Sequence, residues 1–377
     1  MKNEISSLEL YYLVREFKVL ENSKVDRIYH PKNTPKELTV VCHVTGQGKH
    51  FLKIMLPGLI LMDDTKEPSD SQTGLGMMLR KYLEGSKLKF VEQKDFERVI
   101  TITFETKSGT QISTYHIVVE LFSKGNIIFC DDKFKILNIL EEQIWKDRTL
   151  KRGETYLYPK SKFNTIKCEE KEFIDQLKSS DKESLVKSLA ILCNLGGTYA
   201  EELCLLSKVD KDKKTSTVTD KEYKKLYKNL ILLLHEEICA NTSEGNIFPF
   251  ELETNKNREI KKYNSFSEAI RENYDLIKHT ESKKESNKNV EKIQKIIDEQ
   301  LKLLEECENE YKENQAKGEL LYEKYQEVSD ILKVIKEART KYSWNAIKQK
   351  LNDNPTFKRT IKDIDEKNNS IIIEMEK

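Results

Sequence analysis

The sequence lacks the long apolar runs that mark a membrane protein. Its longest apolar stretch, residues 51–62, is 12 residues long and contains Lys53 and Pro57, whereas a helix that spans a bilayer needs about 20 apolar residues. The first residues carry no apolar signal segment either. We therefore expect a soluble, cytoplasmic protein without a membrane partner.

Patterns for metal binding, redox chemistry and common enzymes are also missing. The seven cysteines are scattered and never spaced as Cys-x-x-Cys, and the six histidines include no His-x-x-x-His pair. Reduced thiols are therefore expected, with no disulfide framework and no zinc site. The sequence has no P-loop, no Gly-x-Ser-x-Gly, no His-Glu-x-x-His and no dinucleotide fingerprint. We predict a protein that is not an enzyme and has no cofactor.

Charge of either sign is not in excess. The chain has 65 basic and 64 acidic side chains, a net charge of +1, so any RNA contact must come from a local basic face. Charged residues nevertheless make up 34% of the chain and hydrophobic residues only 37%, against a usual charged share of about 25%. This composition is typical of globular domains joined to long exposed helices.

The first 170 residues predict an α+β module. Residues 5–20 have helical periodicity and a capping box, Ser6-x-x-Glu9. Period-two alternation then predicts eight strands, with one helix at about 74–85 between the third and fourth; the strands are residues 38–44, 50–56, 59–62, 87–92, 97–105, 111–122, 126–130 and 133–138. We expect a mostly antiparallel sheet or a two-layer sandwich.

Residues 171–280 predict a helical module with one distinctive turn. Short helices are expected at 171–178, 182–192 and 198–207, a longer one that is capped by Thr219-x-x-Glu222 and runs to about Ala240, a hairpin within 246–263 and a helix at 265–279. The turn Asn194-Leu-Gly-Gly197 matches a helix-hairpin-helix pattern, in which glycines allow a phosphate to approach the next helix. We therefore expect Gly196, Gly197 and Thr198 to bind RNA phosphate. The alternative is an ordinary glycine helix end.

Residues 281–343 predict the first helix of a coiled-coil arm. Apolar residues recur at heptad spacing from Val290 to Leu332, and at 1.5 Å per residue the arm would be about 90 Å long. Residues 344–377 predict an incomplete tip, with a helix at 344–351 and a strand at 371–375 that opens at Asn369. Because this seam needs a partner, either the natural chain continues with a returning helix or a second chain supplies one; we favour a piece of a longer chain.

Two short basic stretches are candidates for an RNA-binding surface. One contains Arg80 and Lys81, and the other contains Lys146 and Arg148. Each has an aromatic neighbour on which a base could stack. The alternative for both is an ordinary solvated surface.

Five stretches, in order and spacing, resemble the NFACT family of archaeal type. They are Ile5-Ser-Ser-Leu-Glu-Leu10, Met78-Leu-Arg-Lys-Tyr-Leu83, Glu120-Leu-Phe-Ser-Lys-Gly-Asn-Ile127, Trp145-Lys-Asp-Arg148 and Asn194-Leu-Gly-Gly-Thr-Tyr-Ala-Glu201. The resemblance implies a first module similar to the N-terminal domain of formamidopyrimidine-DNA glycosylases, then a helix-hairpin-helix module and a coiled coil.

The resemblance also implies a function in ribosome-associated quality control. Proteins of this family are adaptors that bind an obstructed large ribosomal subunit, with its rRNA and peptidyl-tRNA. They recruit tRNA, mainly alanyl-tRNA, so that the stalled chain gains a C-terminal tail without mRNA. The ribosome itself performs the peptide transfer.

The family positions for tRNA binding fall at Glu9, Glu97 and Arg98. The family generally has Asp at the two acidic positions, so each side chain here is longer by one methylene group, and we expect tRNA binding to be kept more readily than tailing. The alternative for Glu9 is a helix cap. For Glu97 and Arg98 it is an exposed pair worth less than about 1 kcal/mol.

Three other functions remain as alternatives. An active DNA glycosylase of the related fold would need an N-terminal proline and a zinc finger, but residues 2 and 3 are Lys and Asn and no four-cysteine set exists. A glycosylase-like module could instead bind nucleic acid without catalysis. The coiled coil could also be the working part of a scaffold protein.

Overall fold

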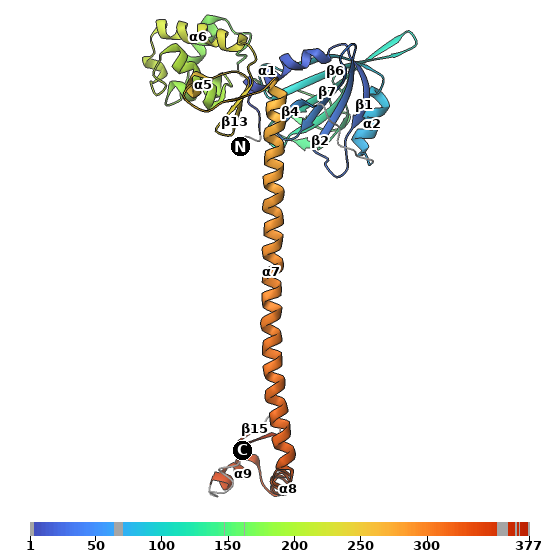
Figure 1. The fold of residues 1–377 in the computed structure, drawn as a ribbon, viewed down its shortest axis with the longest axis vertical. Helices are drawn as coiled ribbons and strands as arrows, with labels where there is room; N and C mark the ends of the chain where they lie inside the picture. The colour runs from blue at the N-terminus through green and yellow to red at the C-terminus, as the bar shows by residue number, and fades with distance from the viewer. Residues whose placement is uncertain are drawn as a thin grey trace. The chain divides into compact units, whose positions relative to one another are not determined.

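The computed structural model describes residues 4–63, 71–146, 148–161, 163–352, 361–365, 368 and 370–375, with side chains described except at 108 and 277–291. The chain divides into two compact units, Met1–Glu281 and Ser282–Lys377 (Figure 1).

A nine-stranded antiparallel sheet forms the first half of the first unit. In spatial order its strands are β4 (Leu59–Asp63), β3 (Gly48–Met55), β2 (Glu37–Val44), β1 (Lys24–Tyr29), β5 (Lys87–Gln93), β6 (Val99–Ser108), β7 (Gln111–Glu120), β8 (Asn126–Asp131) and β9 (Ile136–Ile139). The predicted antiparallel sheet is confirmed. The prediction missed β1, which pairs along its length with β2 and meets β5 at Lys24 and Lys87.

Two helices pack against this sheet. Helix α1 (Ser7–Phe17) begins with the predicted capping box between Ser6 and Glu9 and continues into a short 3₁₀ turn, η1 (Lys18–Leu20). Helix α2 (Gly74–Leu83) is capped by the side chain of Thr73. Both helices bury leucines on one face, as their apolar periodicity predicts.

The second half of this unit is mainly helical. It contains α3 (Glu170–Lys178), α4 (Leu185–Leu192), α5 (Gly196–Ser207), η2 (Thr215–Thr217), α6 (Asp220–His235) and η3 (Glu253–Asn255). Two short antiparallel sheets complete the unit: β10 (Gln143–Ile144) with β11 (Thr149–Leu150), and β12 (Asn241–Ser243) with β13 (Asn246–Phe248) and β14 (Lys261–Lys262). The hairpin predicted within 246–263 therefore begins earlier, at Asn241.

Helix α1 makes several of the contacts between the two halves. The hydroxyl of the buried Tyr12 donates to the carbonyl of Leu233 at 2.6 Å, and Arg15 donates to the carbonyl of Glu236 at 2.9 Å. The Tyr12 ring also lies 5.1 Å from that of Phe250. One continuous hydrophobic core includes residues of both halves, so the position of the helical half is fixed relative to α1.

The long helical region differs from the prediction in its continuity. Helix α7 (Phe266–Glu323) is one continuous helix where two were predicted (Figure 1). It ends before Lys324, and α8 (Tyr325–Lys341) follows, so the predicted uninterrupted arm is wrong at that point. Heptad positions such as Leu304 and Leu332 are exposed. Coiled-coil pairing stays a prediction, and the Val290 side chain lies outside the described residues.

The tip of the second unit has a small core of its own. Helix α9 (Trp344–Asn352) follows α8, and β15 (Ile361–Asp365) pairs with β16 (Ser370–Ile373). The predicted C-terminal strand is confirmed, although its partner β15 was missed and Asn369 lies outside the described residues. Isoleucines from α8, α9 and β15 form the core.

No helix in the described part of the chain combines the length and apolarity needed to cross a membrane.

Candidate nucleic-acid interface

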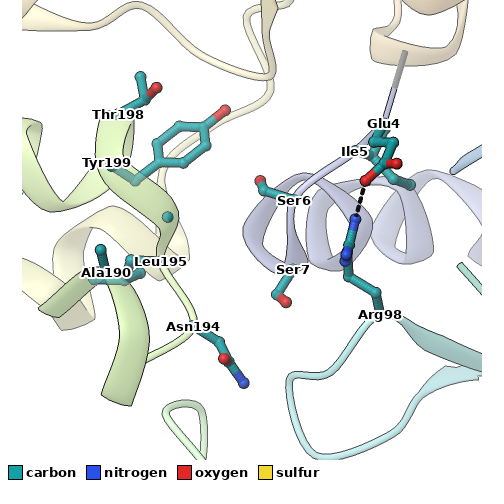
Figure 2. A pocket seen from close by; sticks show the side chains of 12 residues that line it. Glu4, Ile5, Ser6, Ser7, Arg98, Ala190, Asn194, Leu195, Thr198 and Tyr199 are labelled. Carbon is teal, nitrogen blue, oxygen red and sulfur yellow. Dashed lines mark hydrogen bonds and ion pairs between the residues drawn. The ribbon is translucent and has the colours of Figure 1, made fainter. Parts of the chain in front are cut away.

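A cavity of about 430 Å³ lies where α1 begins, beside the start of β6 and the α4–α5 turn (Figure 2). It belongs entirely to the first unit. Its lining includes four of the predicted site residues together with their neighbours: Glu4, Ile5, Ser6, Ser7, Arg98, Ala190, Asn194, Leu195, Gly196, Gly197, Thr198 and Tyr199. Residues far apart in sequence are therefore brought to one place.

Arg98 supplies the cation on one wall of this cavity. It follows a tight turn in which Asp95 and Phe96 have positive φ values of 47° and 60°. Its Nη1 donates to Oε2 of Glu4 at 2.7 Å, with side chains 29% and 48% exposed (Figure 2). Because an ion pair this exposed contributes less than about 1 kcal/mol, a phosphate can replace Glu4 at little cost.

The glycine turn forms the opposite wall. Asn194 (φ 52°) and Gly196 (φ 71°) both adopt left-handed backbone, and α5 begins at Gly196. A Cβ atom placed on Gly196 or Gly197 would meet no atom within 4 Å, so both face open space. Leu195 provides no side-chain cap, and the first N–H groups of any helix lack intrahelical partners and carry partial positive charge.

The alternative of an ordinary glycine helix end does not describe this turn. Helix α4 ends at Leu192 with Cys193 as its C-cap, and the left-handed residue that follows is Asn194. Gly196 and Gly197 instead open α5. Phosphate binding by Gly196, Gly197 and Thr198 stays a prediction, with Gly197 and Thr198 exposed.

Glu9 connects α1 to α5. Its side chain is 1% exposed. One carboxylate oxygen accepts from the backbone N–H of Ser6 at 2.7 Å, and the other accepts from the hydroxyl of Tyr199 at 2.8 Å. Burial, and next the charge of Glu9, raise the pKa of Tyr199 well above its usual value, so the phenol remains a hydrogen-bond donor.

Glu97 makes a second connection to the same turn. Its Oε1 accepts from Nδ2 of Asn194 at 2.9 Å. The backbone around it is held by Gln93, whose Nε2 donates to the carbonyls of Glu97 and Ser7 at 3.0 and 2.8 Å. Both predicted carboxylates therefore bind the α4–α5 segment in this structure.

The predicted basic residues of α2 lie outside this cavity. Nε of Arg80 donates to the carbonyl of Ile28 at 2.7 Å and lies 3.6 Å from Glu84. The ammonium of Lys81 is 5.7 Å from the Tyr82 ring. Neither lines the cavity, and RNA binding by this stretch stays a prediction.

Arg148 is engaged in a buried cluster instead. Its guanidinium forms two hydrogen bonds with Glu120, at 2.5 and 3.3 Å, where the two side chains are only 12% and 2% exposed. Tyr156 donates to the same carboxylate at 2.9 Å, and Arg148 lies over the Trp145 ring at 4.7 Å. Lys146 is exposed nearby. RNA binding by Lys146 and Arg148 stays a prediction.

Sequence reasoning missed Glu4, Asn194 and Tyr199 as site residues. Asn194 and Tyr199 stand inside the glycine motif, but their partners are 97 and 190 residues away, and no local pattern connects them. Nothing in the sequence around Glu4 indicated that it pairs with Arg98.

Metal ligation has no support in the described ranges: no group of three or more His, Cys, Asp or Glu side chains there could hold an ion.

Comparison with known proteins identifies the family. Residues 6–363 match the family model described as NFACT N-terminal and middle domains. The chain belongs to the NFACT family. The archaeal Rqc2 homologue aRqcH of Methanocaldococcus jannaschii is 30% identical over 94% of this chain and 55% of its own length. Ribosome quality control complex subunit 2 of Saccharomyces cerevisiae is 25% identical over 44% of this chain and 15% of its own length.

This NFACT chain thus spans about half the length of the archaeal relative, and less of the yeast protein. Its fold is similar to that of the N-terminal region of the fibronectin/fibrinogen-binding protein from Streptococcus suis, with a TM-score of 0.60 and 19% identity over 72% of this chain and 99% of that one. At this identity the similarity concerns the fold alone. The expected likeness of the first module to a glycosylase domain stays a prediction.

Proposed function

We propose that this NFACT chain belongs to a ribosome-associated quality control factor and binds tRNA through the cavity between Arg98 and the glycine turn. The observation that carries the proposal is that a guanidinium and an open helix N-terminus line one cavity. A phosphate placed there accepts hydrogen bonds from Arg98 and from the N–H groups of Gly197 and Thr198. Guanidinium forks and helix N-termini are both well suited to bind a phosphate.

The larger function follows from the family. The yeast relative is named ribosome quality control complex subunit 2, and the archaeal relative is named as an Rqc2 homologue; we extend the role in the yeast name to this chain. The factor binds large ribosomal subunits, through rRNA, when they carry a stalled peptidyl-tRNA. It then recruits tRNA, preferentially alanyl-tRNA, for tailing without mRNA. The ribosome performs the chemistry in the cytoplasm, and the chain acts as an adaptor.

The first test is a fluorescence-anisotropy titration with tRNA at low salt. We expect Arg98→Ala to weaken binding by at least about tenfold, because hydrogen bonds to charged groups contribute about 1.5–3 kcal/mol. Arg258→Ala is the matched control, since Arg258 forms a similar exposed pair with Glu244 at 2.7 Å and does not line the cavity.

Two outcomes would contradict the tRNA proposal: no tRNA binding by the wild-type chain at low salt, or equal binding by the Arg98 and Arg258 variants. Duplex DNA serves as a competitor in the same titration. Displacement of tRNA by duplex DNA at equal concentration would favour a general glycosylase-like nucleic-acid-binding module.

The second test addresses the ribosome. The protein is sedimented with large subunits that carry peptidyl-tRNA, and with subunits stripped of it. We expect co-sedimentation with the first and much less with the second. Equal recovery of the protein with both kinds of subunit would contradict the assignment to obstructed subunits. Failure to co-sediment with either kind would contradict it as well.

A further inference from the structure

We propose that Glu9 and Glu97 are positioning residues, which hold the glycine turn opposite Arg98 through Tyr199 and Asn194 and do not contact RNA themselves. This inference rests on the proposed function, because it concerns how the phosphate-binding cavity is kept open. It assigns roles to Tyr199 and Asn194 that the sequence did not suggest.

The first support is the position of the two hydrogen bonds along the turn. Asn194 comes directly before Leu195, Gly196 and Gly197, and Tyr199 directly follows Thr198. The bond from Asn194 to Glu97 is 2.9 Å and the bond from Tyr199 to Glu9 is 2.8 Å. The segment that offers its N–H groups is therefore held at both ends.

The second support is where the two acceptors come from. Glu9 belongs to α1, and Glu97 lies in the turn before β6, next to Arg98. Arg98 and the residue that holds the glycine turn, Glu97, are therefore neighbours in the chain. A phosphate that bridges Arg98 and the turn needs this spacing, because hydrogen bonds weaken sharply outside about 2.7–3.2 Å.

The third support is that Glu9 is poorly placed to contact RNA directly. It is 1% exposed, and its carboxylate accepts from both Ser6 and Tyr199. An ionised carboxylate also repels a phosphate at short range. A change at Glu9 therefore reaches the RNA through the orientation of α5.

The length of the two side chains is part of this arrangement. Glutamate reaches the hydroxyl of Tyr199 and the amide of Asn194 at ordinary hydrogen-bond distances. Aspartate is shorter by one methylene group, so on an unchanged backbone its oxygens would stop beyond hydrogen-bond reach. The longer acids at positions 9 and 97 thus fit the separation of the two walls in this chain.

The experiment measures tRNA affinity of the full chain with Tyr199→Phe and Asn194→Gly. Neither change removes a positive charge, and glycine keeps the left-handed backbone at position 194. We expect each to weaken tRNA binding about fivefold, the effect of one net hydrogen bond. The control is Tyr223→Phe, since Tyr223 is also fully buried and donates to the carbonyl of Thr215 at 2.7 Å, away from the cavity.

Variants of Glu9 distinguish a positioning role of this side chain from a direct contact with RNA and from an effect of its charge. In Glu9→Gln the amide oxygen can still accept from the N–H of Ser6 and keep the capping box, while the amide NH2 group can donate to the hydroxyl oxygen of Tyr199. We therefore expect binding within about twofold of wild type, whereas Glu9→Ala should weaken it about fivefold. Combining Glu9→Ala with Tyr199→Phe should weaken binding no more than the stronger single change, because both remove one interaction. A purely structural role would instead lower the unfolding midpoint and leave affinity unchanged.

The outcomes distinguish this inference from the proposed function. If Arg98→Ala binds tRNA like wild type, the proposed function fails. If Arg98→Ala weakens binding while Tyr199→Phe binds like Tyr223→Phe, the positioning role is overturned. An equal loss in Glu9→Gln and Glu9→Ala would overturn it as well, since charge rather than geometry would then be decisive.

Discussion

Arg98 and Glu4 form a 2.7 Å ion pair at the mouth of the cavity, so the cation assigned to a phosphate is already paired in the absence of RNA. Because both side chains are partly exposed, the pair is weak. Glu4 acts as an internal competitor for the guanidinium.

Replacing this competitor is expected to strengthen tRNA binding. Glu4→Gln keeps the shape of the side chain but removes its charge, so tRNA affinity should rise about three- to fivefold at low salt, equivalent to about 1 kcal/mol. The measurement is the same anisotropy titration. Glu244→Gln, which breaks the similar pair with Arg258, should leave affinity unchanged; a rise in both variants would point to net charge alone.

The two glycines of the turn are expected to respond differently to alanine. Gly196 has a φ of 71°, which costs an alanine about 1–2 kcal/mol, so Gly196→Ala should lower the free energy of unfolding by roughly that amount. Gly197 lies within α5 without positive φ and with open space around it. Gly197→Ala should keep full stability yet weaken tRNA binding, because its methyl group enters the cavity.

Urea denaturation and tRNA titration of both glycine variants provide the check. Equal stability of the two variants would contradict the turn geometry. A Gly197→Ala protein with unchanged tRNA affinity would show that the turn does not approach the phosphate.

Arg148 is expected to matter for stability. Arg148→Met leaves the carboxylate of Glu120 buried without its cation, which costs about 3–5 kcal/mol in comparable pairs. Adding Glu120→Gln should recover part of this loss, because no buried charge remains. Urea denaturation measures the stability of the single and the double variant. If Arg148→Met instead lost tRNA binding while its stability stayed unchanged, Arg148 would contact RNA directly.

Buried histidines are expected to make stability depend on pH. Burial lowers the pKa of His30, and also that of His116, below the usual value. The unfolded chain therefore takes up protons that the folded chain does not, and the free energy of unfolding should fall as pH decreases below about 6.5. His30→Gln should make this dependence shallower between pH 7.5 and 5.5, whereas His235→Gln, at an exposed position, should not.

The strands were predictable where side chains alternate strictly. In β6 the buried Ile100, Ile102 and Phe104 recur at every second residue. Strand β1 was missed because a bulge between Val25 and Arg27 shifts its register. Two buried apolar side chains then stand three residues apart, at Val25 and Ile28, which is not a period-two pattern.

Only those residues of the site that lie in short sequence motifs were predictable from the sequence. The glycine turn and Arg98 stand in short motifs, but the contacts of Glu9 with Tyr199 and of Glu97 with Asn194 depend on how α1 packs against the helical half. Local charge also cannot distinguish a cation available for RNA from one already paired. Arg148 is an example, because its partner Glu120 belongs to a strand 28 residues earlier.

The salt dependence of tRNA affinity tests the central claim most directly. The affinities of the wild-type chain and of Arg98→Ala are measured from low to moderate salt, and the logarithm of the binding constant is plotted against that of the salt concentration. Loss of one phosphate contact should make the slope for Arg98→Ala shallower by about 0.7–0.9. Parallel lines for the two proteins would mean that Arg98 contacts no phosphate, and would contradict the account.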